Sequence, residues 1–277
     1  MPKKSSTVVS MAHCSKPLLT ATTPLTWTVP GSRKQKKKRF MRQSIKQLYG
    51  NKLGALDGKI GQVKDFYFDD RSWAVRYLVA DTGSWLPGRQ VLISPHSLDR
   101  LDRTARVLRV NLTREQIEGS PAIEQHKPVS RRYEEEYYNH YGWPYYWQGD
   151  ALWGISGFPI LEQATRLLPV EHALVTANYG EGDDAHLRST KGVIGYHLQA
   201  KDGIIGQVCD FMMEPQSWGI CQLVIKIGHR SSEKEIEIPA SKVDRISYEE
   251  IAVCVNLTIE DVEQGIAHDL AAIGAGD

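Results

Sequence analysis

Short runs of alternating apolar and polar residues, separated by turn residues, recur in two parts of the chain. In the first part these runs are rich in β-branched and aromatic residues, a composition typical of β-strands, and they cover residues 59–68, 73–81, 91–94, 98–101 and 107–111. Asp57-Gly58 and Asp202-Gly203 are dipeptides of the kind found in type I′ hairpin turns, because glycine adopts a positive φ without strain. We therefore predict mainly β structure in both parts.

The two parts are copies of one unit. When the chain is shifted by 145 positions, residues 50–118 align without a gap on residues 195–263, with 25 identities among 69 positions. Self-similarity of this length indicates a tandem duplication. The longest shared stretches are residues 60–63 (IGQV) on 205–208 and residues 110–113 (VNLT) on 255–258.

Each copy has strand edges that need protection from unwanted pairing. Five or six short strands within about 60 residues favour a small barrel or a strongly coiled sheet, because closure removes exposed edges. Thr113 and Thr258 are each followed three residues later by Gln or Asp, which is the spacing of a capping box at a helix start. We therefore expect a helix after each barrel, a short one that stops near residue 119 and a longer one over residues 258–270.

The repeated motif resembles that of a known family. It reads Gly-x-x-Leu-x-Ala-x-Asp-Gly-x-Ile-Gly-x-Val-x-Asp-Phe, followed by Ser-Trp and a strand, and it begins at Gly50 and again at Gly195. In this form it resembles the PRC-barrel domain, a small β-barrel shared by the photosynthetic reaction centre H subunit and a ribosome maturation factor. The resemblance implies two PRC-type barrels in tandem that act as an adaptor for other macromolecules. It brings no catalytic residues and no cofactor.

The segment between the copies, residues 119–189, has a different composition. Ten of the chain's 24 aromatic residues fall within residues 133–158. Ser130 and the Gly and Pro that follow residue 141 predict a short helix over residues 130–141. Because they recur every four residues, three tyrosines of this helix form one stripe: Tyr133, Tyr137 and Tyr141. We therefore predict an aromatic-rich helical linker between the barrels.

Two interpretations of these aromatic residues stay open. The stripe and the run that contains Trp143 and Trp147 either pack on the first barrel or between the two barrels, since each buried ring removes about 150–250 Å² from water. Alternatively, they form an exposed docking patch, because Tyr and Trp dominate the hot spots of protein interfaces. Stacking on nucleic acid requires basic residues among the rings, whereas residues 134–136 are all Glu.

The loop of residues 82–90 is a second candidate contact. It carries Trp85 and Leu86, whereas its counterpart in the second copy, residues 227–235, is polar. This difference predicts that the first copy binds a protein partner through apolar surface. The alternative is that Trp85 folds back on its own barrel.

Charge separates the N-terminal segment from the rest. The whole chain has a net charge of +1, but residues 1–46 hold 11 Lys and Arg and no acidic residue, so the remainder carries −10. Residues 1–44 are rich in Ser, Thr, Pro and Lys without apolar periodicity, which predicts a disordered basic tail. Translation that starts at Met41 would leave that tail outside the native protein. We divide the chain into this tail, a first barrel (45–118), the aromatic segment (119–189) and a second barrel with its helix (190–270).

No pattern of catalytic or metal-binding residues is maintained in both copies. Asp57, Asp65 and Asp99 recur as aspartates in the second copy, but no His recurs with them and no His pair has metal-ligand spacing. The four cysteines form no CxxC pair, which argues against a zinc ribbon. Cys209 and Cys221 are predicted almost opposite each other across a hairpin. They form either a redox-sensitive thiol pair or a soft-metal site on the second barrel, or they are small reduced side chains.

These patterns predict a non-catalytic, cytoplasmic adaptor or assembly module without a metal or cofactor, whose barrel loops and edges dock a protein partner. No apolar run reaches the 18–20 residues or so that span a bilayer. The acidic body disfavours nucleic acid as a partner. The alternatives are a ribosome- or RNA-associated maturation factor, a component that associates with a membrane or photosynthetic complex, and a self-assembling protein whose barrels pair as homodimers.

Overall fold

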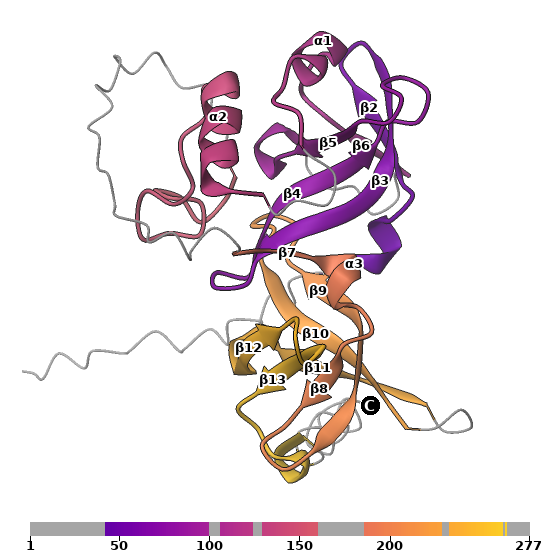
Figure 1. The fold of residues 1–277 in the computed structure, drawn as a ribbon, viewed down its shortest axis with the longest axis vertical. Coiled ribbons are helices and arrows are strands. Elements are labelled where there is room, and N and C mark those ends of the chain that lie inside the picture. Colours follow the sequence, from indigo (N-terminus) through magenta and orange to yellow (C-terminus); the bar gives the residue numbers. More distant parts are fainter. Residues whose placement is uncertain are drawn as a thin grey trace, which may run out of the picture. The chain divides into compact units, whose positions relative to one another are not determined.

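Two β-sheets with corresponding strand orders form the body of the chain (Figure 1). The computed structural model describes residues 42–99, 106–123, 129–159, 186–228, 233–262 and 264. The first sheet, in the order β5-β4-β3-β2-β6, consists of β2 (Lys52–Ala55), β3 (Gly58–Asp69), β4 (Ala74–Asp81), β5 (Gln90–Ile93) and β6 (Val107–Arg109). The second, in the order β11-β10-β9-β8-β13-β12, consists of β8 (His197–Gln199), β9 (Ile204–Met213), β10 (Ile220–Ile227), β11 (Lys234–Pro239), β12 (Val243–Ser247) and β13 (Ala252–Val255).

The pairing of the strands is the same in both copies. β2 pairs with β6, and β8 with β13, in parallel, whereas the other neighbours along each order are antiparallel. The sheets curl so that an early strand of each copy meets a late one. The structure is therefore mainly β with a curled, barrel-like sheet, as the alternation of apolar and polar residues predicts. Of the predicted strand at residues 98–101, Leu98 forms a bridge to Val110, and the part from residue 100 lies outside the described residues.

A glycine within the long strand of each copy allows two backbones to approach closely. A Cβ atom on Gly61 would lie 2.0 Å from the Asp81 carbonyl oxygen, and one on Gly206 would lie 2.3 Å from that of Lys226. Both separations are far below van der Waals contact, so only glycine fits at these positions. The shared glycine is thus explained by strand packing.

The hairpin turn differs in detail from the prediction. Ala55 pairs with Gly58, so the two central residues of the turn are Leu56 and Asp57 rather than Asp57 and Gly58. The carboxylate of Asp57 accepts a hydrogen bond from the backbone N–H of Arg114 (2.9 Å), where a helix begins. Asp202 makes the equivalent bond with the backbone of Ile259. The shared aspartate therefore tethers the following helix to the turn.

Short helices connect and flank the sheets. The α-helices are α1 (Arg114–Glu118), α2 (Arg131–Tyr141) and α3 (Thr190–Val193), and the 3₁₀-helices are η1 (Lys46–Leu48), η2 (Pro95–Ser97) and η3 (Ala240–Lys242). The capping box predicted at Thr113 is present, with Gln116 as its partner. Thr258 and Asp261 exchange the same two bonds at the start of a helix over residues 259–262. The predicted continuation of that helix to residue 270 lies outside the described residues, apart from residue 264.

Each sheet also receives a strand from the segment that precedes the other copy. β1 (Gln43–Ser44) pairs with β9 of the second sheet, and β7 (Leu187–Ser189) pairs with β3 of the first sheet. Figure 1 shows β7 beside the purple strands of the first copy. Because of this exchange, buried side chains of both copies belong to one hydrophobic core. All of these contacts lie within the unit Phe40–Asp277.

Two of the sequence predictions concern residues 1–44, of which the structure describes only the last three. The basic tail of residues 1–44 is described only from Arg42, and Met41 as a start lies outside the described residues. Among the residues that the structure does describe, no helix has both the length and the apolar character needed to cross a membrane.

Candidate interaction site

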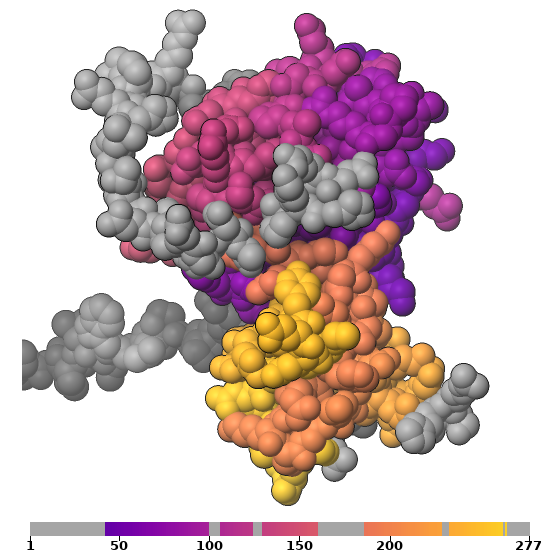
Figure 2. Space-filling model, viewed as in Figure 1, coloured from indigo at the N-terminus to yellow at the C-terminus, as the bar shows by residue number. Residues whose placement is uncertain are grey.

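The tyrosine stripe of α2 packs on the first sheet. Tyr137 is fully buried, and its hydroxyl donates to the Leu92 carbonyl (3.0 Å) and accepts from the Ser94 N–H (3.1 Å) at the edge strand β5. Tyr133 and Tyr141, at either end of the stripe, are partly buried and also donate to backbone carbonyls. The packing interpretation therefore accounts for all three tyrosines. Figure 2 shows the segment that contains α2 (pink) against the first copy (purple).

The aromatic loop after α2 continues this packing. Gly142 ends the helix in the left-handed conformation, with φ of 66°, which glycine adopts without a steric cost. Trp143 is then nearly buried and stacks on Tyr141, with 4.5 Å between ring centroids. Trp147 is partly buried and stacks on Tyr145 at 4.6 Å. Both tryptophans therefore contribute to the packing of the aromatic segment rather than standing free of it.

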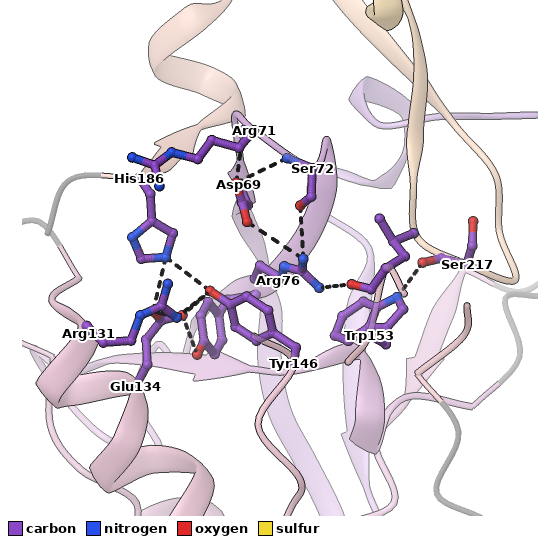
Figure 3. Close-up of polar contacts among 12 residues, drawn as sticks. Asp69, Arg71, Ser72, Arg76, Arg131, Glu134, Tyr146, Trp153, His186 and Ser217 are labelled. Carbon is purple, nitrogen blue, oxygen red and sulfur yellow. Dashed lines mark hydrogen bonds and ion pairs between the residues drawn. The ribbon is translucent and has the colours of Figure 1, made fainter. Parts of the chain in front are cut away.

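A fully buried carboxylate, Glu134, lies at the contact between α2 and the first sheet (Figure 3). Its Oε1 atom accepts hydrogen bonds from the hydroxyls of Tyr77 (3.0 Å) and Tyr146 (2.8 Å). Burial raises the pKa of both tyrosines well above the ordinary value, so both remain protonated donors. Hydrogen bonds to an ionised acceptor are about twice as strong as neutral ones. The two tyrosines therefore compensate part of the cost of burying the charge.

The other oxygen of Glu134 faces two nitrogen groups. Oε2 lies 2.9 Å from Nη1 of Arg131 and 3.1 Å from Nε2 of the buried His186. His186 immediately precedes β7, the strand donated to the first sheet. Its Nδ1 atom is buried and has no hydrogen-bond partner among the described residues. Glu134 thus joins α2, the first sheet and the start of the exchanged strand.

A buried arginine completes this cluster from the sheet side. Arg76 stacks over Tyr146, with 3.7 Å from its Cζ atom to the ring centroid, and also faces Trp153 at 4.9 Å. It donates to the Leu152 carbonyl (2.7 Å) and the Ser72 hydroxyl (2.9 Å). Buried cations are stabilised by paired acceptors and by aromatic faces, and Arg76 has both. The aromatic segment is therefore fixed to the sheet by charge as well as by apolar contact.

The polar groups of this cluster are largely used in bonds to one another. Both oxygens of Glu134 already accept two close donors each, which leaves no free carboxylate face for a substrate. In the ranges that the structure covers, no group of three or more His, Cys, Asp or Glu side chains is arranged to hold a metal ion. The geometry therefore identifies a scaffold that holds the aromatic segment in place.

The loop that carries Trp85 and Leu86 folds back toward the first sheet. Both side chains are partly buried and pack against the core. The guanidinium carbon of Arg114 lies 4.9 Å from the centroid of the Trp85 ring. This arrangement matches the alternative in which Trp85 covers its own barrel.

The two cysteines considered as a thiol pair are not cross-strand partners. Each is an extra residue at a β-bulge, because the register between β9 and β10 shifts at both positions. Cys221 approaches the Met212 carbonyl (3.1 Å), whereas Cys209 lies 4.0 Å from Glu235. Burial raises the pKa of both thiols, which lowers their reactivity. The expectation that they lie opposite each other is therefore wrong, since a sequence alone does not reveal the bulges.

Within the described part of the aromatic segment, a short loop over residues 151–158 carries two exposed large apolar side chains. Trp153 is buried and donates from its indole N–H to the Ser217 carbonyl (2.7 Å) of the second copy. Antiparallel bridges join residues 151 and 154, and residues 153 and 156. Beyond this anchor Ile155 is 92% exposed and Phe158 is 43% exposed. Two apolar side chains are therefore presented to solvent from an anchored loop.

Comparisons with known proteins do not assign the chain to a family. No family model matches it, and no curated protein matches it significantly. The resemblance to the PRC-barrel domain therefore rests on the repeated motif alone.

Sequence reasoning missed several members of this region. The sequence places Glu134 among three consecutive glutamates, which is typical of a solvated helix face. Its position between Arg131 and the tyrosine stripe is the signal that could have identified it, because an i,i+3 ion pair beside an apolar stripe lies near the buried boundary. His186 carries no such signal, since it reaches the cluster through the strand exchange.

Proposed function

We propose that the chain is a non-catalytic adaptor or assembly module, made of two PRC-type barrels in tandem, that docks a protein partner through Ile155 and Phe158. The observation that carries this proposal is the 92% exposure of Ile155 on a loop anchored by the buried Trp153. A loop whose backbone is already anchored loses little conformational freedom on binding, which favours association. The aromatic stripe and the Trp85 loop serve as internal support in this proposal.

The contrast with the buried cluster favours an adaptor over an enzyme. Glu134 and Arg76 are both used in fixing α2 and the aromatic segment to the first sheet. Apolar residues on a surface, next to aromatic rings and rimmed by polar groups, are typical of protein interfaces.

The test is a crosslinked pull-down with the tagged full chain from cells that produce it, with and without nuclease. The double variant Ile155→Asp with Phe158→Asp should lose at least 10-fold of the recovered partner, since a desolvated charge at an interface core costs several kcal/mol. Its melting temperature should stay close to that of the parent, because the Ile155 side chain is largely solvated.

A matched control places aspartate at two other exposed apolar positions, Leu56 (68% exposed) and Ile251 (54% exposed). This control should retain the partner. Equal loss in both variants would contradict the assignment of the loop. Recovery of ribosomal components that disappears with nuclease would favour the maturation-factor alternative instead.

A further inference from the structure

Equivalent residues of the two copies make reciprocal contacts across the boundary between them. Asp65 of β3 accepts hydrogen bonds from the hydroxyl of Ser189 and the backbone N–H of Lys191 (3.1 Å). At a shift of 145 positions, Asp210 of β9 accepts from the hydroxyl of Ser44 and the backbone N–H of Lys46 (2.9 Å). Each aspartate thus binds a Ser-x-Lys segment that leads into the other copy.

A second pair of contacts has the same reciprocity. The N–H of Val75 donates to the Trp218 carbonyl (2.9 Å), and the N–H of Ile220 donates to the Trp73 carbonyl (2.7 Å). Both tryptophans have φ of 57°, a conformation that costs a bulky residue on the order of 1–2 kcal/mol. In both copies this strain falls on the tryptophan whose carbonyl oxygen accepts a hydrogen bond from the other copy.

Apolar packing lies between these two sets of bonds. Phe68 of β3 contacts Phe211 of β9 with 5.6 Å between ring centroids, and Phe66 contacts Trp218 at 6.4 Å. Phe66, Phe68 and Phe211 are fully buried. The boundary between the copies therefore has a buried aromatic centre with polar bonds on either side of it, which is the composition of a stable protein interface.

A contact in which residue i of one unit meets residue j of the other, and j meets i, is the pattern of a two-fold symmetric dimer. We infer that the exchange surface is a self-recognition surface: each unit binds a second copy of the unit without needing the chain that connects them. In this protein the second copy is supplied by the same polypeptide. This inference rests on the contacts of the exchange and does not depend on the proposed adaptor role.

The test cuts the chain between the two copies. A protease recognition sequence is inserted within residues 160–185 of the full chain, and the purified protein is cut and passed through gel filtration at micromolar and then nanomolar concentration. We expect the two fragments to elute together as a 1:1 complex at micromolar concentration. Separation of the fragments at micromolar concentration, without denaturant, would overturn the inference, and the lower concentration measures how tightly they bind.

Paired aspartate variants locate the contact. Asp65→Ala with Asp210→Ala removes acceptors between the units, and should raise the concentration at which the cut fragments separate by roughly 100-fold or more, because charge-assisted bonds are lost. The matched control, Asp57→Ala with Asp202→Ala, removes acceptors that serve each unit's own helix. Equal effects in both variants would contradict the assignment.

Two further measurements keep the inference falsifiable. If the aspartate variant does not fold, Ser44→Ala with Ser189→Ala keeps both carboxylates and should weaken the complex about 10-fold. It removes the hydroxyl donors together with the local bonds that these hydroxyls accept from the N–H groups of Gln47 and Gly192. Crosslinking of the cut chain after dilution and reconcentration should give homotypic pairs beside the original pair. Their complete absence would overturn recognition of a like copy.

Discussion

The two copies have corresponding sheets but differ in what covers strands β4 and β5 in the first copy and β10 and β11 in the second. In the first copy Arg76, Tyr77 and Leu92 contact the aromatic segment. The equivalent residues of the second copy are Cys221, Gln222 and Glu237, and there the side chain of Arg42 hydrogen-bonds Gln222 and pairs with Glu237 (2.9 Å). One face is covered by rings, and the other carries polar side chains.

The difference shows how the duplicated unit diverged. Core positions kept their character, as Phe66 and Phe211 or Leu78 and Leu223 illustrate. Positions outside the core differ according to what covers them. Tyr77 and Leu92 lie under the aromatic segment, whereas the equivalent Gln222 and Glu237 of the second copy lie nearer to solvent. The covered face therefore stabilises the first copy in ways that the second copy lacks.

The largest expected effect comes from Glu134→Ala, which should destabilise the protein by about 3–5 kcal/mol. The substitution leaves Arg131 and His186 without their buried carboxylate and removes the acceptor of two tyrosine hydroxyls. The measurement is the free energy of unfolding in urea. Hydrogen exchange should show the loss of protection concentrated in α2 and the first sheet.

Glu136→Ala is the matched control on the same helix. Glu136 is exposed and pairs with the exposed Arg132 at 3.3 Å, so its removal should cost less than about 0.5 kcal/mol. If the two variants destabilise the protein equally, Glu134 does not hold the aromatic segment in place.

The second prediction concerns the free energy of unfolding at acidic pH. It involves the first copy, because the position equivalent to His96 in the second copy is Ser241. Burial, together with the nearby Arg76, lowers the pKa of His96 from 6.5 to about 4. The unfolded chain therefore binds a proton between pH 6.5 and 4 that the folded chain does not bind. The free energy of unfolding should fall across this window as pH decreases, by roughly 3 kcal/mol at most.

The measurement is urea unfolding at several values of pH, compared with the variant His96→Gln. Glutamine cannot take up the proton, so the variant should lose that share of the pH dependence, whatever its stability at neutral pH. An unchanged slope of stability against pH would show that His96 makes no contribution. His96 also stacks on Trp143, with 5.6 Å between ring centroids, so its ring belongs to the buried aromatic cluster.

Much of the fold of the two copies was predictable from the sequence, because the duplication shows the pattern of most strands twice. The strands around Gly61 and Gly206, the capping boxes at Thr113 and Thr258, and the helix from residue 131 to 141 all depend on local periodicity and capping chemistry. The strand and capping patterns occur in both copies, whereas the helix of residues 131–141 lies between them and occurs once.

The interaction site was harder to predict because its geometry is not local. The strand exchange extends the repeat back to Ser44 and Ser189, before the glycines where the alignment begins, and only two identities there suggest it. The bulges that separate Cys209 from Cys221 depend on how β10 fits β9. For Tyr137 the stripe left two interpretations open, burial against a barrel or exposure in a docking patch. In the structure its side chain is buried against the first sheet.

The smallest expected effect is a gain of about 1 kcal/mol in the second copy from Ile251→Asn. Ile251 has φ of 50°, which is strained for a β-branched side chain, whereas asparagine tolerates the left-handed region. Its side chain is 54% exposed, so little buried area is lost. Urea unfolding measures the gain, and Ile204→Asn, at another exposed position but without a positive φ, should give none. If both variants have the same stability, the strain at Ile251 is not a difference between the copies.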